Sequence, residues 1–288
     1  MKRYNIINEI PPGINVDGKL ILFDRPKVMG IINATPDSFH SVSRVSDVHE
    51  ALKLAEKMVS EGADFLDVGG CSTRPGSEPP SVETEWERIA EILPNLRKHF
   101  PDTVISVDTF RSEIAHRAIE HGAQMVNDIS GGTLDPQILK VVARHQVPYV
   151  VSHLKGVPKT MQENPEYQDL IGEIYYYFSQ RLKKIREAGI NDIILDPGFG
   201  FGKRLEDNFM ILKNLHVFND FAMPIMVGLS RKSMIYKALG VTPEEALNGT
   251  TALHMAALMS GAHLLRVHDV REAVQTIKLY ELIKYAEV

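Results

Sequence analysis

The chain has 288 residues, of which 44% are hydrophobic and 24% charged, with a formal net charge of −5 and a sequence pI of about 6.1. A chain of this length can bury a large core, and α/β barrels of similar length commonly form one domain, so we expect residues 1–288 to be a single domain. The small negative charge and the lack of a Lys/Arg block argue against a surface for nucleic acid or anionic membranes and favour small-molecule chemistry.

Cysteine usage and hydropathy indicate the compartment. Cys71 is the only cysteine, so an intrachain disulfide is excluded. The first residues, MKRYNIINEIPPG, lack the apolar segment of a secretory signal, and no stretch approaches the ~20 apolar residues of a membrane-spanning helix. We therefore expect a cytoplasmic protein without a membrane-spanning helix.

A short β-hairpin is the first element that we expect. Residues 14–16 and 20–23 are mostly apolar, and the Asp17-Gly18 pair between them is typical of a type I′ turn. The second strand ends before Pro26. Residues 1–27 are therefore predicted to form a hairpin extension ahead of the main fold.

From residue 28 onward the chain repeats one unit eight times, a short apolar run followed by a longer segment with helical periodicity. The apolar runs are residues 28–32, 64–68, 104–107, 125–127, 149–151, 193–195, 225–227 and 264–267. Such runs are typical of parallel strands covered by helices, and eight units predict a (β/α)₈ TIM barrel. A doubly wound open sheet is the alternative, but no GxGxxG turn follows the first strand.

The helical segments support the barrel because each has an apolar face that could cover the strands. These faces are Leu52, Ala55 and Val59 on one helix, and Leu170, Ile174, Phe178, Leu182 and Ile185 on a longer one. Polar residues near helix starts are expected to be N-caps rather than catalytic groups. They are Asp47, Ser81, Ser112, Asp135 and Asp207.

The active site of a TIM barrel lies at the C-terminal ends of its strands, so the residues that end each strand are the candidates. They are Asn33, Asp108, Asn127, His153, Asp196, Arg266 and His268, with the segments 35–39, 69–76 and 230–233. Each alone is explained by turn hydrogen bonds or solvation, but their convergence on one rim indicates a site.

These candidates divide by charge into two groups. The deep group is Asp108, Asn127 and Asp196, and the rim of cations and hydrogen-bond donors is Thr73, Arg74, Arg231, Lys232, Arg266 and His268. Carboxylate and amide groups can recognise a ring with adjacent N–H donors, such as an aminopyrimidinone, whereas the rim suits phosphate oxygens. The predicted ligand is a heterocycle that carries phosphate.

The run LDPGFGFGK, residues 195–203, is the most informative single stretch. Asp196 ends an apolar strand, where a buried carboxylate is costly unless it has a partner. The alternating glycines allow close backbone approach, and Phe199 and Phe201 would provide flat walls beside the acid. The alternative is a tight βα turn in which Asp196 caps the following helix.

Seven runs in order resemble the motifs of the dihydropteroate synthase family. They are MGIINATPDSF (29–39), GGCSTRPG (69–76), SVDT (106–109), NDI (127–129), LDPGFGFGK (195–203), GLSRKSM (228–234) and RVHDV (266–270). The resemblance implies a (β/α)₈ transferase of folate biosynthesis that joins 6-hydroxymethyl-7,8-dihydropterin diphosphate to 4-aminobenzoate and releases diphosphate. It also implies a homodimer and a sulfonamide target.

The resemblance assigns roles to residues of this chain. Pterin contacts fall on Asp108, Asn127, Asp196 and Lys232. Diphosphate contacts fall on Asn33, Thr73, Arg266 and His268, with Mg²⁺ at Asn33. Aminobenzoate contacts fall on Phe39, Arg74, Pro75, Phe201 and Ser233. The implied catalytic residues are Asp37, Lys232, Arg266 and His268.

The expected chemistry is departure of diphosphate to leave a cation on the pterin methylene, followed by attack of the aminobenzoate amine. Mg²⁺, Arg266 and His268 would stabilise the leaving group, and Asp37 would stabilise the cation. A catalytic Cys71 is the alternative, but no histidine lies near it in sequence, so a packed cysteine is favoured.

The chain departs from the usual family pattern at three places. Residues 40–44 replace a run that is Ser-Asp-Gly-Gly in many members, so the first loop is less rich in glycine. Cys71 stands where many members have Glu, and Ser152 and Leu154 replace methionines beside His153. None of the residues assigned above is lost.

Two other functions are the alternatives. A folate-dependent corrinoid methyltransferase domain shares the barrel, but it would leave Arg231, Arg266 and His268 without an evident purpose. A non-catalytic pterin-binding protein would not need the TPDSF run of the first loop.

One segment bears on assembly. Residues 250–262 are apolar around most of a helix, which predicts packing against a second copy, the alternative being burial by the chain's own neighbouring elements.

Overall fold

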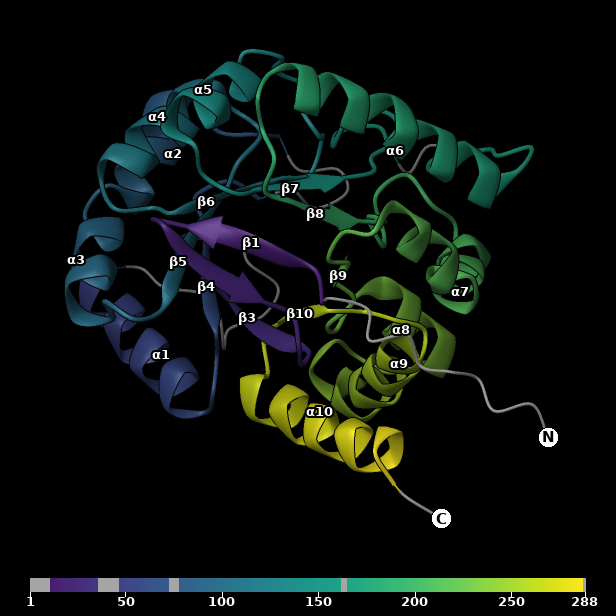
Figure 1. Cartoon of the computed structure of the whole chain (residues 1–288). Coiled ribbons are helices and arrows are strands. Elements are labelled where there is room, and N and C mark those ends of the chain that lie inside the picture. Colours follow the sequence, from purple (N-terminus) through teal and green to yellow (C-terminus); the bar gives the residue numbers. More distant parts are fainter. Residues whose placement is uncertain (1–10, 36–46, 73–77, 162–164, 287–288) are drawn as a thin grey trace.

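The computed structural model describes residues 11–35, 47–72, 78–161 and 165–286. Within these ranges the chain forms an eight-stranded parallel sheet and a separate two-stranded antiparallel sheet. Figure 1 shows the parallel strands at the centre with helices α1 to α10 arranged around them. In the described parts of the chain, no helix is long and apolar enough to cross a membrane.

The parallel strands form a closed barrel. They are β3 (Lys27–Asn33), β4 (Phe65–Gly69), β5 (Val104–Asp108), β6 (Met125–Asp128), β7 (Tyr149–Ser152), β8 (Ile193–Asp196), β9 (Met226–Val227) and β10 (Leu264–Val267). Their order is β8-β7-β6-β5-β4-β3-β10-β9, and a parallel bridge between Leu195 and Ile225 joins the two ends. The predicted (β/α)₈ barrel is therefore confirmed, and the open doubly wound sheet is excluded.

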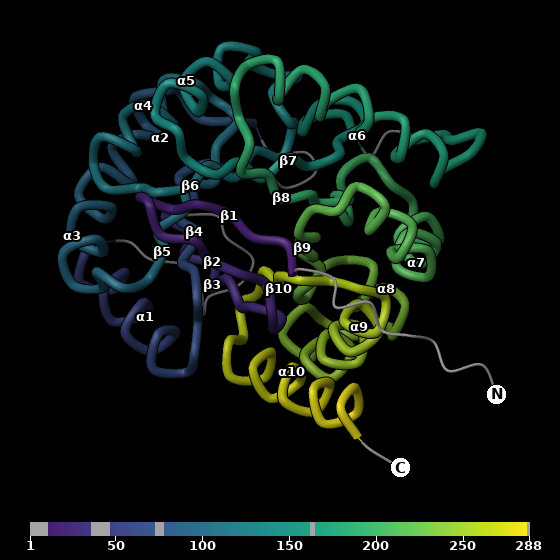
Figure 2. Tube along the Cα trace, viewed as in Figure 1, coloured from purple at the N-terminus to yellow at the C-terminus, as the bar shows by residue number. Residues whose placement is uncertain are grey.

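The helices lie on the outer face of the barrel, as the trace in Figure 2 also shows. They are α1 (Val48–Ser60), α2 (Val82–Ile89), α3 (Ile92–His99), α4 (Ser112–Glu120), α5 (Ile138–His145), α6 (Leu170–Glu187), α7 (Leu205–Lys213), α8 (Ser233–Leu239), α9 (Leu247–Met259) and α10 (Val270–Lys284). The five apolar residues expected to face the core on α6 are all buried. On α1 the buried face is Ala51, Ala55 and Met58, while Leu52 and Val59 pack at its edge.

The predicted N-caps are correct at two helices. Asp47 and Ser81 each accept a backbone hydrogen bond from the first turn of the following helix. The other three predictions are wrong. Ser112 is the first residue of α4, and its N–H donates to Asp135, which thereby ties two βα segments together. Asp207 lies inside the first turn of α7 and accepts the N–H of the residue that precedes the helix.

The N-terminal hairpin closes one end of the barrel. Strands β1 (Gly13–Val16) and β2 (Lys19–Leu22) pair around Asp17 and Gly18, which have φ of 50° and 79° as a type I′ turn requires. Ile14, Val16 and Phe23 form a buried cluster with barrel side chains that include Phe65. This apolar plug lies at the N-terminal ends of the strands, which leaves the C-terminal ends for a ligand.

Candidate active site

A buried polar network joins four strands near the C-terminal end of the barrel. Arg266 on β10 donates from Nε to Asp67 Oδ2 at 2.6 Å and from Nη2 to Asp108 Oδ2 at 2.6 Å. Asn127 Nδ2 donates to Asp67 Oδ2 at 2.9 Å. Burial raises the pKa of Asp108 to about 7, although Arg266 opposes this shift. Three predicted site residues, Asp108, Asn127 and Arg266, therefore lie together.

Asp67 is a member of this network that the sequence analysis missed. It is fully buried on β4, inside a run predicted only as an apolar strand. A carboxylate in the middle of such a run was the available signal, because a buried charge needs a partner. Its partner, Arg266, is 199 residues away in sequence.

The network leaves buried polar atoms without a hydrogen-bond partner among the described residues. These are Asp67 Oδ1, Asp108 Oδ1, Asn127 Oδ1 and Ser106 Oγ. An unpaired buried polar group costs about 1–3 kcal/mol, so four of them in one place need an explanation. A bound molecule with several N–H donors would pair them.

Asp196 lies at the end of β8 beside a second set of fixed groups. Its Oδ1 accepts the N–H of Gly198 at 2.8 Å, and its Oδ2 accepts the hydroxyl of Ser152 at 3.1 Å. The turn interpretation is thus partly correct, but Asp196 does not cap α7, whose N-cap is Arg204. Burial lowers the pKa of Lys232 to about 8, while the charge of Asp196 raises it.

Lys203 holds the glycine-rich turn after β8 in place, a role that the sequence analysis did not assign. Its buried ammonium contacts the carbonyl oxygens of Gly198 (2.7 Å), Phe201 (3.1 Å) and His153 (3.1 Å), and Nδ1 of His153 (3.0 Å). Burial lowers the pKa of His153 well below its usual value, so the neutral ring can accept this bond. His153, expected at the rim, is instead part of this support.

The turn also requires glycine at Gly198. Its φ is +74°, and a Cβ there would lie 2.1 Å from the carbonyl oxygen of His153. The turn in this conformation presents the Phe199 carbonyl to Lys232 Nζ at 2.6 Å and places the Phe201 ring 4.4 Å from the same ammonium. The Phe201 ring therefore lies against the cation of Lys232, whereas the Phe199 ring, the other expected wall, is buried in the core.

The rim residues are less uniform than the sequence predicted. Arg231 makes a bidentate ion pair with Asp269 and also donates to the carbonyl of Pro243, so the structure places it in a helix-anchoring contact. His268 Nδ1 lies 3.2 Å from Ser230 Oγ. Ser233 begins α8 directly after Lys232.

Asn33 ends β3 opposite Gly69 in the strand register, so it lies on the rim as predicted. The other predicted residues lie outside the described part of the chain. They are Asp37, Phe39, Thr73, Arg74 and Pro75.

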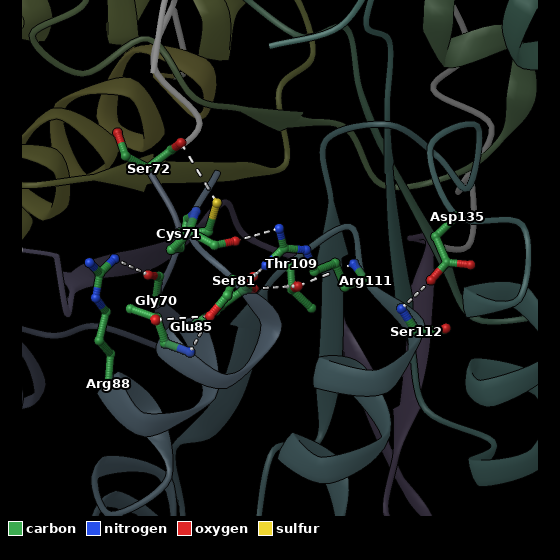
Figure 3. Close-up of polar contacts among 12 residues, drawn as sticks. Gly70, Cys71, Ser72, Ser81, Glu85, Arg88, Thr109, Arg111, Ser112 and Asp135 are labelled. Carbon is green, nitrogen blue, oxygen red and sulfur yellow. Dashed lines mark hydrogen bonds and ion pairs between the residues drawn. The ribbon is translucent and has the colours of Figure 1, made fainter. Parts of the chain in front are cut away.

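Cys71 is not a nucleophile in this structure. It is buried two residues after the end of β4, and burial together with the nearby charge of Glu85 (Figure 3) raises the pKa of its thiol to about 12. A thiol with this pKa stays protonated at neutral pH. The prediction of a packed cysteine is confirmed.

Comparison with known proteins identifies the family. The family model for pterin binding enzymes matches residues 29–268. The dihydropteroate synthase of Escherichia coli (strain K12) is 41% identical over 266 residues, which cover 92% of this chain and 94% of that protein. The dihydropteroate synthase of Synechocystis sp. is 43% identical over 268 residues, covering 91% and 92%. The chain belongs to the dihydropteroate synthase family.

Solved structures of the dihydropteroate synthase family have the same fold. The Yersinia pestis enzyme, solved with a sulfonamide drug complex, superposes with a TM-score of 0.92 at 37% identity and covers 95% of this chain and 100% of that one. The Thermus thermophilus enzyme in complex with 4-aminobenzoate has a TM-score of 0.85 at 36% identity, covering 94% and 99%. Membership in this family makes the chain an enzyme, a transferase of folate biosynthesis.

Proposed function

We propose that the chain condenses 6-hydroxymethyl-7,8-dihydropterin diphosphate with 4-aminobenzoate to give 7,8-dihydropteroate and diphosphate. The observation that carries this proposal is the group of unpaired buried atoms on Asp67, Asp108 and Asn127 beside Asp196. A pterin presents adjacent N–H donors along one edge and would pair these acceptors. The corrinoid methyltransferase and the non-catalytic binding protein are not favoured by the relatives.

The pterin would bind deep in the barrel. Asp108, Asn127 and Asp196 would accept its N–H groups, and Lys232 would donate to a ring acceptor. The 2.6 Å contact of Lys232 with the Phe199 carbonyl supports this assignment, because it fixes the ammonium next to Asp196. Asp67 would belong to the same acceptor group, because it accepts hydrogen bonds from Arg266 and Asn127.

The diphosphate would bind at the rim, at Asn33, Thr73, Arg266 and His268. The amide oxygen of Asn33 is a ligand type that Mg²⁺ accepts, and Mg²⁺ commonly takes its remaining ligands from substrate phosphates and water. When bound, Mg²⁺ would neutralise charge on the departing diphosphate. Arg266 would stabilise the same charge while its ion pairs with two aspartates hold it in position.

The aminobenzoate would bind over Phe201, with Phe39, Arg74, Pro75 and Ser233 completing the pocket. The carbon–oxygen bond of the pterin methylene breaks as diphosphate leaves with the electron pair. The amine nitrogen then forms the new carbon–nitrogen bond and loses one proton. Asp37 would stabilise the intermediate cation.

The direct test is to incubate the protein with the pterin diphosphate, 4-aminobenzoate and Mg²⁺ and to measure dihydropteroate by mass spectrometry and diphosphate by a coupled assay. We expect equimolar formation of both products. Absence of both, with the protein folded by circular dichroism, would contradict the proposal.

We also propose that the enzyme is a cytoplasmic homodimer. One face of α9 is buried by the chain's own neighbouring elements, at Thr250, His254, Ala257 and Leu258. However, Met259 on α9 is more than half exposed, and so are several apolar residues of the adjacent α10. Exposed apolar surface of this kind on two neighbouring helices supports a contact with a second copy.

A further inference from the structure

Arg231, in the turn between β9 and α8, has an unusual backbone conformation. Its φ is +52°, in the left-handed region that costs free energy for a residue with a Cβ. The other described residues of this kind that are not glycine are Asp17 in the hairpin turn and Gln146 and Ala222, which follow helices. Arg231 is thus the one that adjoins a proposed substrate contact, Lys232. A strained backbone persists only where the surrounding structure holds it in place.

The contacts of Arg231 supply that hold. Nε and Nη2 donate to the two carboxylate oxygens of Asp269 at 2.7 and 2.9 Å, and Nη1 donates to the carbonyl oxygens of Pro243 and Glu244 at 3.0 and 2.5 Å. The backbone N–H donates to Thr250 Oγ1 at 3.1 Å. The side chain is only 8% exposed. The guanidinium is therefore committed to contacts within the chain and has little capacity left to bind phosphate.

These contacts join two turns that carry proposed substrate residues. Lys232, the next residue in the chain, lies in the proposed pterin subsite. Asp269, which Arg231 holds, directly follows His268 of the proposed diphosphate subsite. Ser230, on the other side of Arg231, lies 3.2 Å from Nδ1 of His268. Arg231 therefore fixes the β9–α8 turn against the β10–α10 turn, and with it Lys232 against His268.

Each of the two substrate residues also has an anchor of its own. Lys232 Nζ donates to the Phe199 carbonyl at 2.6 Å, and its backbone N–H donates to the carbonyl of Leu229 at 3.1 Å. His268 directly follows β10, whose Val267 is in register with Gly30 of β3. The local position of each residue is therefore secured without Arg231, and what Arg231 adds is their position relative to each other.

We propose that Arg231 is a positioning residue that sets the distance and orientation between the pterin and diphosphate subsites. This inference rests on the proposed function, in which Lys232 contacts the pterin and His268 the diphosphate of one substrate. A substrate whose two parts are covalently joined binds tightly only when both subsites fit it at once, because its second contact is intramolecular. Glycine at position 231 would relieve the strained φ but could not hold the two turns together, which gives the arginine a purpose.

The test compares the joined substrate with its separate parts in Arg231→Met. Calorimetry should show the Kd of 6-hydroxymethyl-7,8-dihydropterin diphosphate, measured with Mg²⁺, rising about tenfold or more, since a misplacement of about 1 Å can cost up to ~100-fold. The Kd of 6-hydroxymethyl-7,8-dihydropterin and that of Mg-diphosphate should each stay within about threefold of wild type, because neither has to span the two subsites. A loss for the joined substrate that does not exceed the losses for its parts would overturn the proposal.

A second variant, Arg231→Gly, separates the guanidinium contacts from the backbone strain. Glycine adopts a positive φ without cost, so this variant should fold and should melt at a higher temperature than Arg231→Met. The selective loss for the joined substrate should persist, because the contacts with Asp269 and with the carbonyl oxygens are absent. Wild-type affinity for the joined substrate in Arg231→Gly would refute the inference.

The matched control is Arg25→Met at the opposite end of the barrel. Arg25 also pairs with an aspartate, Asp64, at 2.6 Å and also donates to a proline carbonyl, that of Pro26, at 3.1 Å. This variant should lower the melting temperature without a selective loss for the joined substrate. A selective loss of equal size in Arg25→Met would show that Arg231 acts only through stability, and the proposal would fail.

Wild-type protein is measured alongside, so that the two proposals can fail separately. Wild-type turnover with tight binding of the joined substrate, together with unchanged affinities in Arg231→Met, refutes only the role of Arg231. Wild-type protein that forms no product and binds the joined substrate no more tightly than its parts refutes both proposals.

Discussion

At the scale of single residues, the carboxylate of Asp196 shows how a strand end becomes a binding group. Each of its oxygens already accepts one hydrogen bond, from Gly198 and from Ser152, and each has a further lone pair for a ligand. The orientation is therefore fixed before any ligand binds. Preorganisation of this kind lowers the cost of binding.

We expect Asp196→Asn to fold but to bind the pterin poorly. An amide has one acceptor oxygen, so either Ser152 or a ligand donor would face an NH₂ group and remain unpaired. The loss should be about 1–3 kcal/mol, roughly 5- to 150-fold in Kd, measured by calorimetry. The control is Asp192→Asn at the other end of this strand, where the carboxylate accepts only the N–H of Asn15 among the described residues. Near-normal pterin affinity in Asp196→Asn would defeat the assignment.

A second residue-scale effect concerns pH. His254 is buried in α9, and neither ring nitrogen has a hydrogen-bond partner among the described residues. Burial lowers its pKa to about 4, although Asp269 opposes this. The imidazole of His254 takes up a proton near pH 6.5 in the unfolded chain but only near pH 4 in the native state. The free energy of unfolding therefore falls as the pH drops from 6.5 to 4.

The variant His254→Leu should lack the part of the pH dependence of unfolding that comes from His254. At pH 5 the lowered pKa costs the wild type about 2 kcal/mol relative to pH 7.5, because one pKa unit corresponds to about 1.36 kcal/mol. Urea unfolding of both proteins at the two pH values measures this. If the variant loses as much unfolding free energy as the wild type between pH 7.5 and 5, His254 is not the responsible group.

At the scale of elements, α9 and α10 lie side by side and present the exposed apolar surface discussed above. We expect Leu279→Glu combined with Leu282→Glu to give a monomer mass in light scattering at micromolar concentration, because two charges would be buried at the interface. The control is Tyr176→Glu, an equally exposed residue on α6. A wild-type protein of monomer mass would contradict the proposed dimer.

At the scale of the whole molecule, the proposed subsites draw on residues from opposite sides of the barrel. The aminobenzoate contacts are expected from the segments after β3, β4, β8 and β9, so this pocket needs several connections in place at once. Arg231 and Arg266 are each paired with aspartates, so repulsion between these two cations is not a reason for ordered binding. Thr73 and Arg74, assigned to diphosphate and to aminobenzoate, are adjacent in the sequence, so a bound diphosphate would lie next to the aminobenzoate subsite.

We therefore expect aminobenzoate to bind only after diphosphate. Calorimetric titration of aminobenzoate into the protein alone should give little heat, and titration in the presence of pterin and Mg-diphosphate should give saturable binding. Equal affinity in both titrations would show that the pocket is preformed. Pterin without diphosphate is the control that separates the two parts of the substrate.

The sequence predicted the barrel and much of the site for physical reasons that are local. Short apolar runs specify buried parallel strands, and their repetition with helical segments specifies the barrel. Polar residues that end those strands must meet at one rim, which is why Asp108, Asn127 and Asp196 were found. Helix caps were predicted less well. Asp135 accepts the N–H of Gln137 just before α5, but its other carboxylate oxygen accepts the N–H of Ser112 at the start of α4, a contact between segments that the sequence does not reveal.

The sequence by itself determined the strands, the helices, the hairpin and the residues that end each strand, since these depend on neighbours along the chain. Only the tertiary structure decided which charges pair, as Arg266 does with Asp67 and Asp108, and as Glu85 does with Arg111. Such pairs join residues that are tens to hundreds of positions apart, and their geometry is set by strand register and barrel closure. Composition and periodicity carry no record of that register.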